Sequence, residues 1–489
     1  MPSSAPSITS NHSRNSGAFS QGSGGKQPQM SSPTEQEILP LGTPRGNNNN
    51  NNAFQTPQNP FASPFSTRTN SARQSLRGET SAVDINQAIL SSRYFHSRRI
   101  KKGSVEQPWI EKKDPRQKWQ TIIPLCGVFL GLCIAGLLIW DGLRTVINHQ
   151  YCLILDDDFS GGFNEKVWMK EVEVGGFGNG QFEMTTGTDE NVFIQDGKLV
   201  IKPTLQDPNL MVTNNTVNLT ALGTCTSASH VWSDCWISTN TTNGSVINPV
   251  KSGRISTRNG PSIKYGKIEV TAQMPAGDWL WPAIWMMPVK DTYGPWPASG
   301  EIDIFESRGN NYTYQMGGNN QMNSALHWGP SAAYDAWWKT YNTRLALHTT
   351  YAAGTHTFGV EWSDTYIFTY VDSRLLQVLY FDFNGPLWKR GNFPQATSNG
   401  TTIVDPWTQT GNPATPFDQD FYLILNLAVG GTNGWFEDGV AGKPWVDASP
   451  TAKKDFWDAR NQWYPTWQNN GQLTIKHVKM WQQKGFNGC

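Results

Sequence analysis

Three carboxylates lie close together in one apolar stretch, Ser299-Gly-Glu-Ile-Asp-Ile-Phe-Glu306. Removing an ionised carboxylate from water is costly, so acids in such a stretch are expected to have a partner or a chemical role. Side chains alternate between the two faces of a β-strand, which places Glu301 and Asp303 on one face and Glu306 on the other. One β-bulge at either of the two residues before Glu306 would return it to the face of the other acids. The spacing therefore predicts three acids in one cleft.

Acids grouped in this way can perform the proton transfers of a glycosidase. One carboxyl group protonates the leaving oxygen, and the other attacks the anomeric carbon or activates water. The two roles require different pKa values. We assign Glu301 as the nucleophile, Glu306 as the general acid/base, and Asp303 as the group that holds a shared proton and orients Glu301. A solvated edge strand is disfavoured, because the apolar residues between the acids need a core to face.

A metal site is also disfavoured. Hard cations bind carboxylates, but this stretch lacks the short Asp/Asn/Gly loop spacing of a calcium site. The sequence also has no Gly-rich phosphate loop and no pair of zinc ligands at a typical spacing. We therefore expect neither a metal nor a cofactor.

The acid motif Glu301-Ile-Asp-Ile-Phe-Glu306 resembles the Glu-x-Asp-x-x-Glu signature of glycoside hydrolase family 16, in the bulged form of its laminarinase-like members. The preceding segment Trp281-Pro-Ala-Ile-Trp-Met-Met-Pro288 resembles the aromatic segment of the same family. Further similar segments are Asn179–Phe182, Ser252–Arg258, Tyr265–Val270, His327–Trp328 and Leu423–Gly431. The resemblance covers roughly residues 155 to 485.

The resemblance implies an all-β fold, a jelly-roll β-sandwich of the concanavalin A type, with the cleft across its concave sheet. It implies a retaining mechanism on β-1,3-glucan or mixed β-1,3/1,4-glucan. Trp281 and Trp285 are then expected to contact glucosyl units, and Arg254, Asn179 and His327 are candidates for binding sugar. Each has a structural alternative: a core Trp, a surface Arg, a turn Asn or a packed His.

Local patterns support an all-β domain independently of the resemblance. Runs rich in Val, Ile, Phe and Tyr between Gly, Pro and Asn turns, such as 355–372 and 472–481, predict strands. Residues 455–462 predict a short helix. The segment 383–417 is rich in Pro, Gly, Asn and Thr, which predicts a long loop that rims the cleft.

The chain before this domain has a different composition. Residues 1 to about 100 are rich in Ser, Asn, Gln, Gly and Pro without apolar periodicity, which predicts disorder. We interpret residues 1–120 as a disordered cytoplasmic tail with a basic juxtamembrane segment. Residues 121–140 carry no charge, and at ~1.5 Å per residue they can span the ~30 Å hydrocarbon core of a bilayer. Their depth in the chain disfavours a cleaved signal peptide.

Charge around residues 121–140 predicts their orientation. The positive-inside rule places the more basic flank in the cytoplasm. The basic residues before the span are Lys101, Lys102, Lys112, Lys113, Arg116 and Lys118, whereas Arg144 alone follows it closely. We therefore expect a single-pass type II membrane protein, with the bilayer as a partner and residues 141–489 as a lumenal or extracellular domain. This topology resembles that of family members associated with fungal β-glucan assembly.

Cysteines and glycosylation sequons agree with an oxidising compartment. The cysteines after the span are Cys152, Cys225, Cys235 and Cys489, an even number that suits two disulfides. Of the three possible pairings we favour Cys225–Cys235 with Cys152–Cys489, because the ends of a sandwich often lie close together. Sequons begin at Asn214, Asn218, Asn240, Asn243, Asn311 and Asn399.

Composition and charge leave two classes of function open. The formal net charge is zero, which gives no indication of a nucleic-acid partner. The first class is an enzyme that hydrolyses β-glucan or transfers its cleaved end to another chain. The second is a membrane-tethered glucan-binding or cell-wall assembly protein with little turnover. The presence of all three acids favours the enzyme, and the tether favours work at the cell wall.

Overall fold

The computed structural model describes residues 99–108, 114–145, 148–229 and 231–489. Almost all of the tail for which the sequence predicts disorder, residues 1–98, lies outside the described residues. Two units are distinguished, 1–113 and 114–489, and the second contains the long helix and the β-domain.

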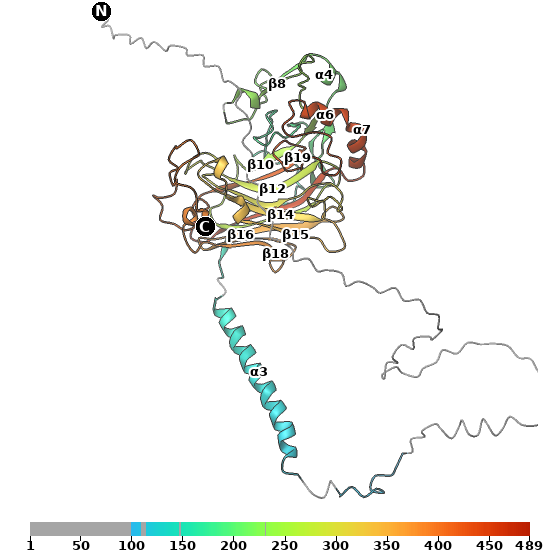
Figure 1. Cartoon of the computed structure of the whole chain (residues 1–489), viewed down its shortest axis with the longest axis vertical. Helices are drawn as coiled ribbons and strands as arrows, with labels where there is room; N and C mark the ends of the chain where they lie inside the picture. Colours follow the sequence, from blue (N-terminus) through green and yellow to red (C-terminus); the bar gives the residue numbers. More distant parts are fainter. Residues whose placement is uncertain (1–98, 109–113, 146–147, 230) are drawn as a thin grey trace, which may run out of the picture. The chain divides into compact units, whose positions relative to one another are not determined.

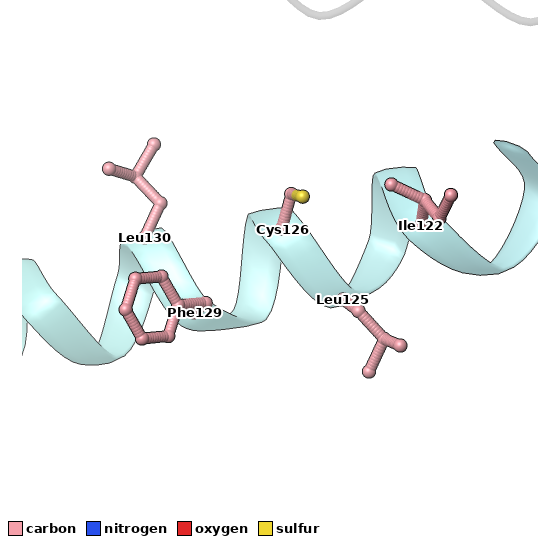
Figure 2. Close-up of a pocket in the computed structure, with 5 residues that line it drawn as sticks. All are labelled: Ile122, Leu125, Cys126, Phe129 and Leu130. Carbon is pink, nitrogen blue, oxygen red and sulfur yellow. The ribbon is translucent and has the colours of Figure 1, made fainter.

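A single long helix, α3 (Gln117–Thr145), contains the whole predicted span. Its side chains from 121 to 140 are all exposed in the structure, and most are apolar. Figure 2 shows five of them, Ile122, Leu125, Cys126, Phe129 and Leu130, projecting from the ribbon. Within the described part of the chain, this is the one helix long and apolar enough to cross a membrane. The bilayer crossing itself stays a prediction.

Two antiparallel sheets form the β-domain (Figure 1). The first, in spatial order, contains β18 (Gln377–Asp382), β17 (Tyr366–Val371), β16 (His356–Trp362), β11 (Gly266–Gln273), β20 (Leu473–Gln483), β5 (Lys198–Ile201) and β4 (Val192–Gln195), with β1 (Tyr151–Asp157) also paired to β20. The second contains β15 (Tyr341–Leu345), β14 (Gln321–His327), β13 (Glu301–Glu306), β12 (Leu280–Pro288), β19 (Phe421–Val429), β10 (Arg254–Ser256) and β2 (Met169–Lys170). We call the second sheet the acid sheet, because it carries the three acids.

Smaller elements accompany the two sheets. Short strands are β3 (Glu183–Thr185), β6 (Thr204–Leu205) and β9 (Val250–Ser252) in one sheet, and β7 (Thr216–Asn218) and β8 (Trp236–Ser238) in another. Short helices are α4 (Pro208–Val212), α5 (Leu387–Gly391), α6 (Ala452–Asp458) and α7 (Arg460–Trp463), with 3-10 turns at Trp232–Asp234, Ala332–Tyr334, Trp337–Lys339 and Tyr464–Trp467. A separate small cluster, Met211, Val246, Ile247 and Trp457, packs α4 against α6.

The core lies between the two sheets. Strand β11 alternates strictly between buried and half-buried residues, as expected for a strand with one face on a core. Strand β19 is buried along its whole length, so both of its faces are covered. Contact between the sheets is direct, since the rings of Phe305 on β13 and Phe358 on β16 lie 4.3 Å apart. The predicted all-β jelly-roll sandwich is confirmed.

Other local predictions can be compared with the structure. Residues 355–372 contain β16 and β17, residues 473–481 of the second predicted strand lie in β20, and residues 455–462 overlap α6 and α7. Both predicted disulfides are present, Cys152–Cys489 with Cα atoms 5.8 Å apart and Cys225–Cys235 with Cα atoms 5.7 Å apart. The first ties β1 to the last residue of the chain.

The segment 383–417, predicted as a long loop, contains the short helix α5 and packs beside the strand that carries the acids. The indole N–H of Trp407 donates to the backbone oxygen of Ala298, 2.8 Å away, in the turn before β13. At the end of that turn Gly300 has φ +82, a conformation that glycine adopts without strain. A Cβ atom there would also lie only 3.1 Å from the ring of Phe417. The loop and the glycine together fix where β13 begins.

Candidate active site

The strand β13 (Glu301–Glu306) has a β-bulge at the place that the acid spacing predicts. Between Asp303 and Glu306 it takes three steps, whereas the paired residues on β14 take two. The pairing with β12 has an irregularity at the same place. The bulge lets Phe305 point into the core, where it is fully buried. The predicted bulge is confirmed. The negative charge of Glu301 contributes to the raised pKa of Glu306, which agrees with the two carboxyl groups sharing one face.

Glu301 begins β13 and receives a hydrogen bond from a tryptophan in the preceding turn. The indole Nε1 of Trp296 donates to Glu301 Oε2 at 2.5 Å. Burial raises the pKa of Glu301, and the negative charge of Asp303 raises it further. The nearby charge of His327 and the indole N–H act in the opposite direction, because both stabilise the carboxylate.

Asp303 is paired with His327, the last residue of β14. His327 Nε2 lies 3.1 Å from Asp303 Oδ2, and its Nδ1 lies 2.5 Å from Asp335 Oδ2. Burial alone would lower the pKa of His327, but the carboxylates of Glu301, Asp303 and Asp335 raise it well above its usual value. His327 is therefore an imidazolium with an acid on each ring nitrogen. It lies beside the acids, and its contact with sugar stays a prediction.

Glu301, Asp303 and His327 are also residue types that could bind a metal cation. Ligand atoms of Glu301, Asp303 and His327 lie within 4.8 Å of one another. An imidazolium carries a proton on both ring nitrogens and has no lone pair to offer a metal. The charge of His327 therefore already occupies the position that a cation would take, in keeping with the expectation of no metal, which stays a prediction.

Glu306 ends β13 and is held by Trp281 of β12. The indole Nε1 of Trp281 donates to Glu306 Oε1 at 2.9 Å. Burial raises the pKa of Glu306 to about 7, with Glu301 adding to the rise and His327, Trp281 and Arg308 opposing it. A carboxyl group with this pKa keeps its proton close to neutral pH, which suits a general acid.

Trp281 itself is almost fully covered. It is 6% exposed, and the ring of Trp435 stacks on it at 4.7 Å with an interplanar angle of 12°. One of its ring faces is therefore taken by protein. Its predicted stacking on a glucosyl unit stays a prediction, whereas its hydrogen bond to Glu306 is a role that the sequence did not indicate.

Arg254 of β10 and Trp285 of β12 lie close together on the acid sheet, although β19 separates their strands. The guanidinium of Arg254 lies 4.7 Å from the ring of Trp285 and 4.0 Å from that of Phe177. Arg254 Nε donates to Glu171 at 2.6 Å, and Trp285 Nε1 donates to Asn426 at 2.7 Å. Both side chains are held by protein partners, and their sugar contacts stay predictions.

Asn179 lies in a turn before β3, and its hydrogen bonds connect it to the segment after β19 rather than to β13. Its side-chain oxygen accepts from Asn433 at 3.2 Å, and its backbone oxygen accepts from Thr432 at 3.2 Å. Among the contacts of the residues that the structure describes, none joins Asn179 to Glu301, Asp303 or Glu306. Its predicted role stays untested.

Four side chains complete the site without having been assigned from the sequence: Trp296, Asp335, Trp435 and Glu171. Trp296 stands in a Pro-bounded turn just before the acid motif, so proximity was a usable signal for it. The other three approach the site from loops and a distant segment. Their positions depend on how the loops pack, which strand periodicity does not encode.

The chain is similar to proteins of a known family. The family model of Glycosyl hydrolases family 16 matches residues 204–416. The beta-1,3-glucan-binding protein of Penaeus monodon is 37% identical over 347 residues, covering 68% of this chain and 91% of that protein. The glucan endo-1,3-beta-glucosidase of Cryptopygus antarcticus is 31% identical over 288 residues, covering 58% of this chain and 82% of that protein.

Among solved structures, the catalytic domain of an endo-1,3-beta-glucanase (laminarinase) from Thermotoga petrophila RKU-1 is 22% identical. It matches with a TM-score of 0.42, over 69% of this chain and all of that one. The extent of the identity with the Penaeus protein, together with the family model, confirms the family that the acid motif predicts. The chain belongs to glycoside hydrolase family 16.

Proposed function

We propose that this protein is a retaining β-glucanase or β-glucan transglycosylase acting on β-1,3-glucan or mixed β-1,3/1,4-glucan. The observation that carries the proposal is the arrangement on β13. Glu301 and Glu306 are each held by their own indole N–H, and the Asp303–His327 ion pair lies beside them. Burying three acids in one place destabilises a fold, and a protein that only binds a neutral glucan has no need of them.

The two glutamates would divide the reaction between them. Glu306, protonated, donates its proton to the glycosidic oxygen while the Glu301 carboxylate attacks the anomeric carbon, and the bond to the leaving sugar breaks. Glu306, now ionised, takes a proton from water or from a sugar hydroxyl. That oxygen attacks the anomeric carbon and releases Glu301. The product retains the configuration of the substrate.

Asp303 would keep Glu301 ready for attack. Burial raises the pKa of both acids, so the pair shares one proton, and Glu301 can attack as a carboxylate only when that proton moves to Asp303. The Trp296 indole N–H and the His327 cation stabilise that charge. Orientation by a neighbouring acid and one fixed donor prepares the nucleophile before the sugar arrives.

A second function, glucan binding with little turnover, is favoured by one specific finding. The relative at 37% identity is named a beta-1,3-glucan-binding protein. In that case the acid sheet would bind the polysaccharide, and the long helix would hold it at a membrane. The two functions differ in turnover, and not in the ligand.

Product analysis tests the proposal. The full chain, purified in detergent, is incubated with laminarin, lichenan and galactan, and the products are separated by size and linkage. The proposal expects shorter or rejoined chains from laminarin or lichenan, with galactan unchanged and new anomeric centres formed in the β configuration by NMR. Binding of laminarin without any change in its size distribution would favour the binding protein instead.

A further inference from the structure

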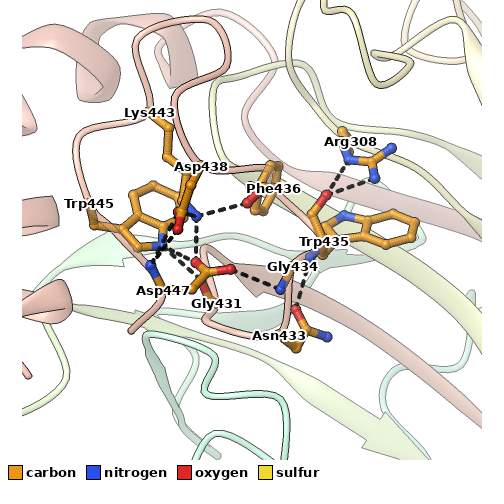
Figure 3. Close-up of polar contacts among 10 residues, drawn as sticks. All are labelled: Arg308, Gly431, Asn433, Gly434, Trp435, Phe436, Asp438, Lys443, Trp445 and Asp447. Atoms are coloured by element: carbon orange, nitrogen blue, oxygen red, sulfur yellow. Dashed lines mark hydrogen bonds and ion pairs between the residues drawn. The ribbon is translucent and has the colours of Figure 1, made fainter. Parts of the chain in front are cut away.

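A buried lysine organises the loop that follows β19. The side chain of Lys443 is 0% exposed. Its Nζ donates to the backbone oxygen of Phe436 at 2.8 Å, to Asp438 Oδ1 at 2.5 Å and to Asp447 Oδ1. All three protons of the ammonium group are therefore used within residues 431–447, which we call the clasp loop (Figure 3).

The same contacts close the clasp loop on itself. Asp447 Oδ2 accepts from the backbone N–H of Gly434 at 2.9 Å, and the Trp445 indole donates to the backbone oxygen of Gly431 at 2.8 Å. Burying an ammonium group costs several kcal/mol unless it is fully paired. An apolar side chain would fill the space without that cost, so the charge has a use in fixing one loop conformation.

The clasp loop presents Trp435 to the acid site. Arg308, two residues beyond β13, donates from Nε at 2.8 Å and from Nη2 at 2.7 Å to the backbone oxygen of Trp435 (Figure 3). Its guanidinium also lies 4.0 Å from the Trp435 ring. The ring stacks on Trp281, whose N–H holds Glu306. A continuous series of contacts thus runs from Lys443 to the general acid.

We propose that Lys443 is a positioning residue for the general acid: it fixes the clasp loop so that Trp435 stacks on Trp281 and Trp281 donates to Glu306. This inference rests on the proposed function. Lys443 touches neither the acids nor the cleft, so it acts through the two indoles. Losing it should free the Trp281 ring to tilt and weaken its hydrogen bond to Glu306.

The pH profile can separate this role from a general effect on folding. The Trp281 N–H stabilises ionised Glu306, so weakening that bond raises the pKa of Glu306. The charged or titratable groups that face Glu306 are Glu301, Asp303, His327, Arg308 and Tyr341. None belongs to the clasp loop, so a variant there changes none of these charges. A shift of the basic limb then reports the positions of Trp281 and Arg308, the two partners of Glu306 that contact Trp435.

The experiment compares Lys443→Met with Lys454→Met in the full chain. Lys454 lies in α6, is exposed, and pairs with Asp458. It serves as the control because it belongs to the same domain but takes no part in the contacts that link Lys443 to Glu306. For Lys443→Met we expect turnover of laminarin to fall roughly tenfold or more, with the basic limb of kcat/KM moving up by about half to one pH unit. An aryl β-glucoside with a good leaving group should lose less, because it needs little protonation. Lys454→Met should match the wild type.

If Lys443→Met does not fold, Trp435→Leu provides a second test of the proposal. It removes the stacking partner and leaves the lysine contacts intact, so it should produce the same upward shift. Trp281→Phe, which lacks the N–H, sets the full size of that shift. A folded Lys443→Met with the wild-type pH profile, or Trp435→Leu without a shift, would overturn the inference while the wild type remains active. A wild type inactive on every β-glucan would overturn the proposed function and this inference with it.

Discussion

At the level of single residues, the two glutamates of β13 differ in what surrounds their carboxyl groups. Both are affected by burial, which raises the pKa of each. Glu301 lies directly across from His327 in the strand pairing and has the Trp296 indole beside it. Glu306 has a different donor, Trp281, and a pKa of about 7. The raised pKa of Glu306 suits a general acid, whereas Glu301, whose pKa is also raised, depends on Trp296 and His327 to stabilise the charge that a nucleophile needs.

The pH dependence follows from the sign of the Glu306 shift. Its pKa is raised to about 7, so the proton needed for catalysis is present below that pH and is lost above it. We expect kcat/KM on laminarin to fall on the basic side with a midpoint close to this value. A basic limb near pH 4 to 5, about the range of an unperturbed glutamate, would contradict the assignment of Glu306.

Glu306→Gln removes the donated proton and keeps the shape of the side chain. We expect turnover of laminarin to fall by about 10² to 10⁴ and the basic limb to disappear. With an activated aryl β-glucoside the first step needs little acid assistance, so formation of the glycosyl-enzyme should be less affected. Pre-steady-state release of the aryl group measures this directly. Equal losses on both substrates would assign Glu306 another role.

At the level of elements, the bulged strand joins the chemistry to the core. Its extra residue lets β13 present three acids to one side while Phe305 reaches Phe358 on the facing sheet. The bulge was predictable because it follows from the spacing of three acids within one short segment and from the two-residue alternation of side chains in a strand. Trp296, in the turn just before the motif, could also have been found by its proximity. The partners Asp335 and Trp435 could not, because they arrive from loops whose packing is set by distant residues.

Phe305→Ala tests the structural side of the bulge. It removes a fully buried ring and leaves every acid in place, so the free energy of unfolding should fall by about 3 to 5 kcal/mol. Leu375→Ala is the matched control, because Leu375 is 91% exposed, and a change within about 0.5 kcal/mol is expected. Chemical denaturation of both variants provides the comparison. Equal stability of the two would mean that the bulge does not anchor β13 to the core.

At the level of the whole molecule, the sequence predicted the long helix and the disulfides better than the details of the cleft. An uncharged run of apolar residues identifies α3, and the even number of later cysteines agrees with the two disulfides found. Both signals can be read from the sequence alone, the first from the composition of one segment and the second from the number of cysteines. The sugar-binding roles of Arg254, Asn179 and Trp285 need the shape of a bound glucan, which neither composition nor strand periodicity carries.

Topology is a prediction of its own. We propose that α3 crosses a bilayer with the β-domain on the lumenal or extracellular side. Five of the six sequons have an exposed asparagine, and Asn218 is half-buried. We expect an endoglycosidase to shift the band of the membrane-bound protein, and Cys225 to resist alkylation until a reductant is added. An unshifted band together with freely alkylated Cys225 would place the domain in the cytosol.

The central claim is that the acids of β13 act on glucan and do not merely lie beneath it. Glu301→Gln keeps the size of the side chain and removes its nucleophilic charge, so the fold and the binding of laminarin should survive while turnover collapses. The decisive measurement is the rate of laminarin cleavage by the wild type and by Glu301→Gln, with binding of each recorded in parallel. We predict equal binding and a rate lower by several orders of magnitude in the variant. If both bind laminarin and both leave it intact at the same negligible rate, the catalytic assignment is contradicted and the glucan-binding function takes its place.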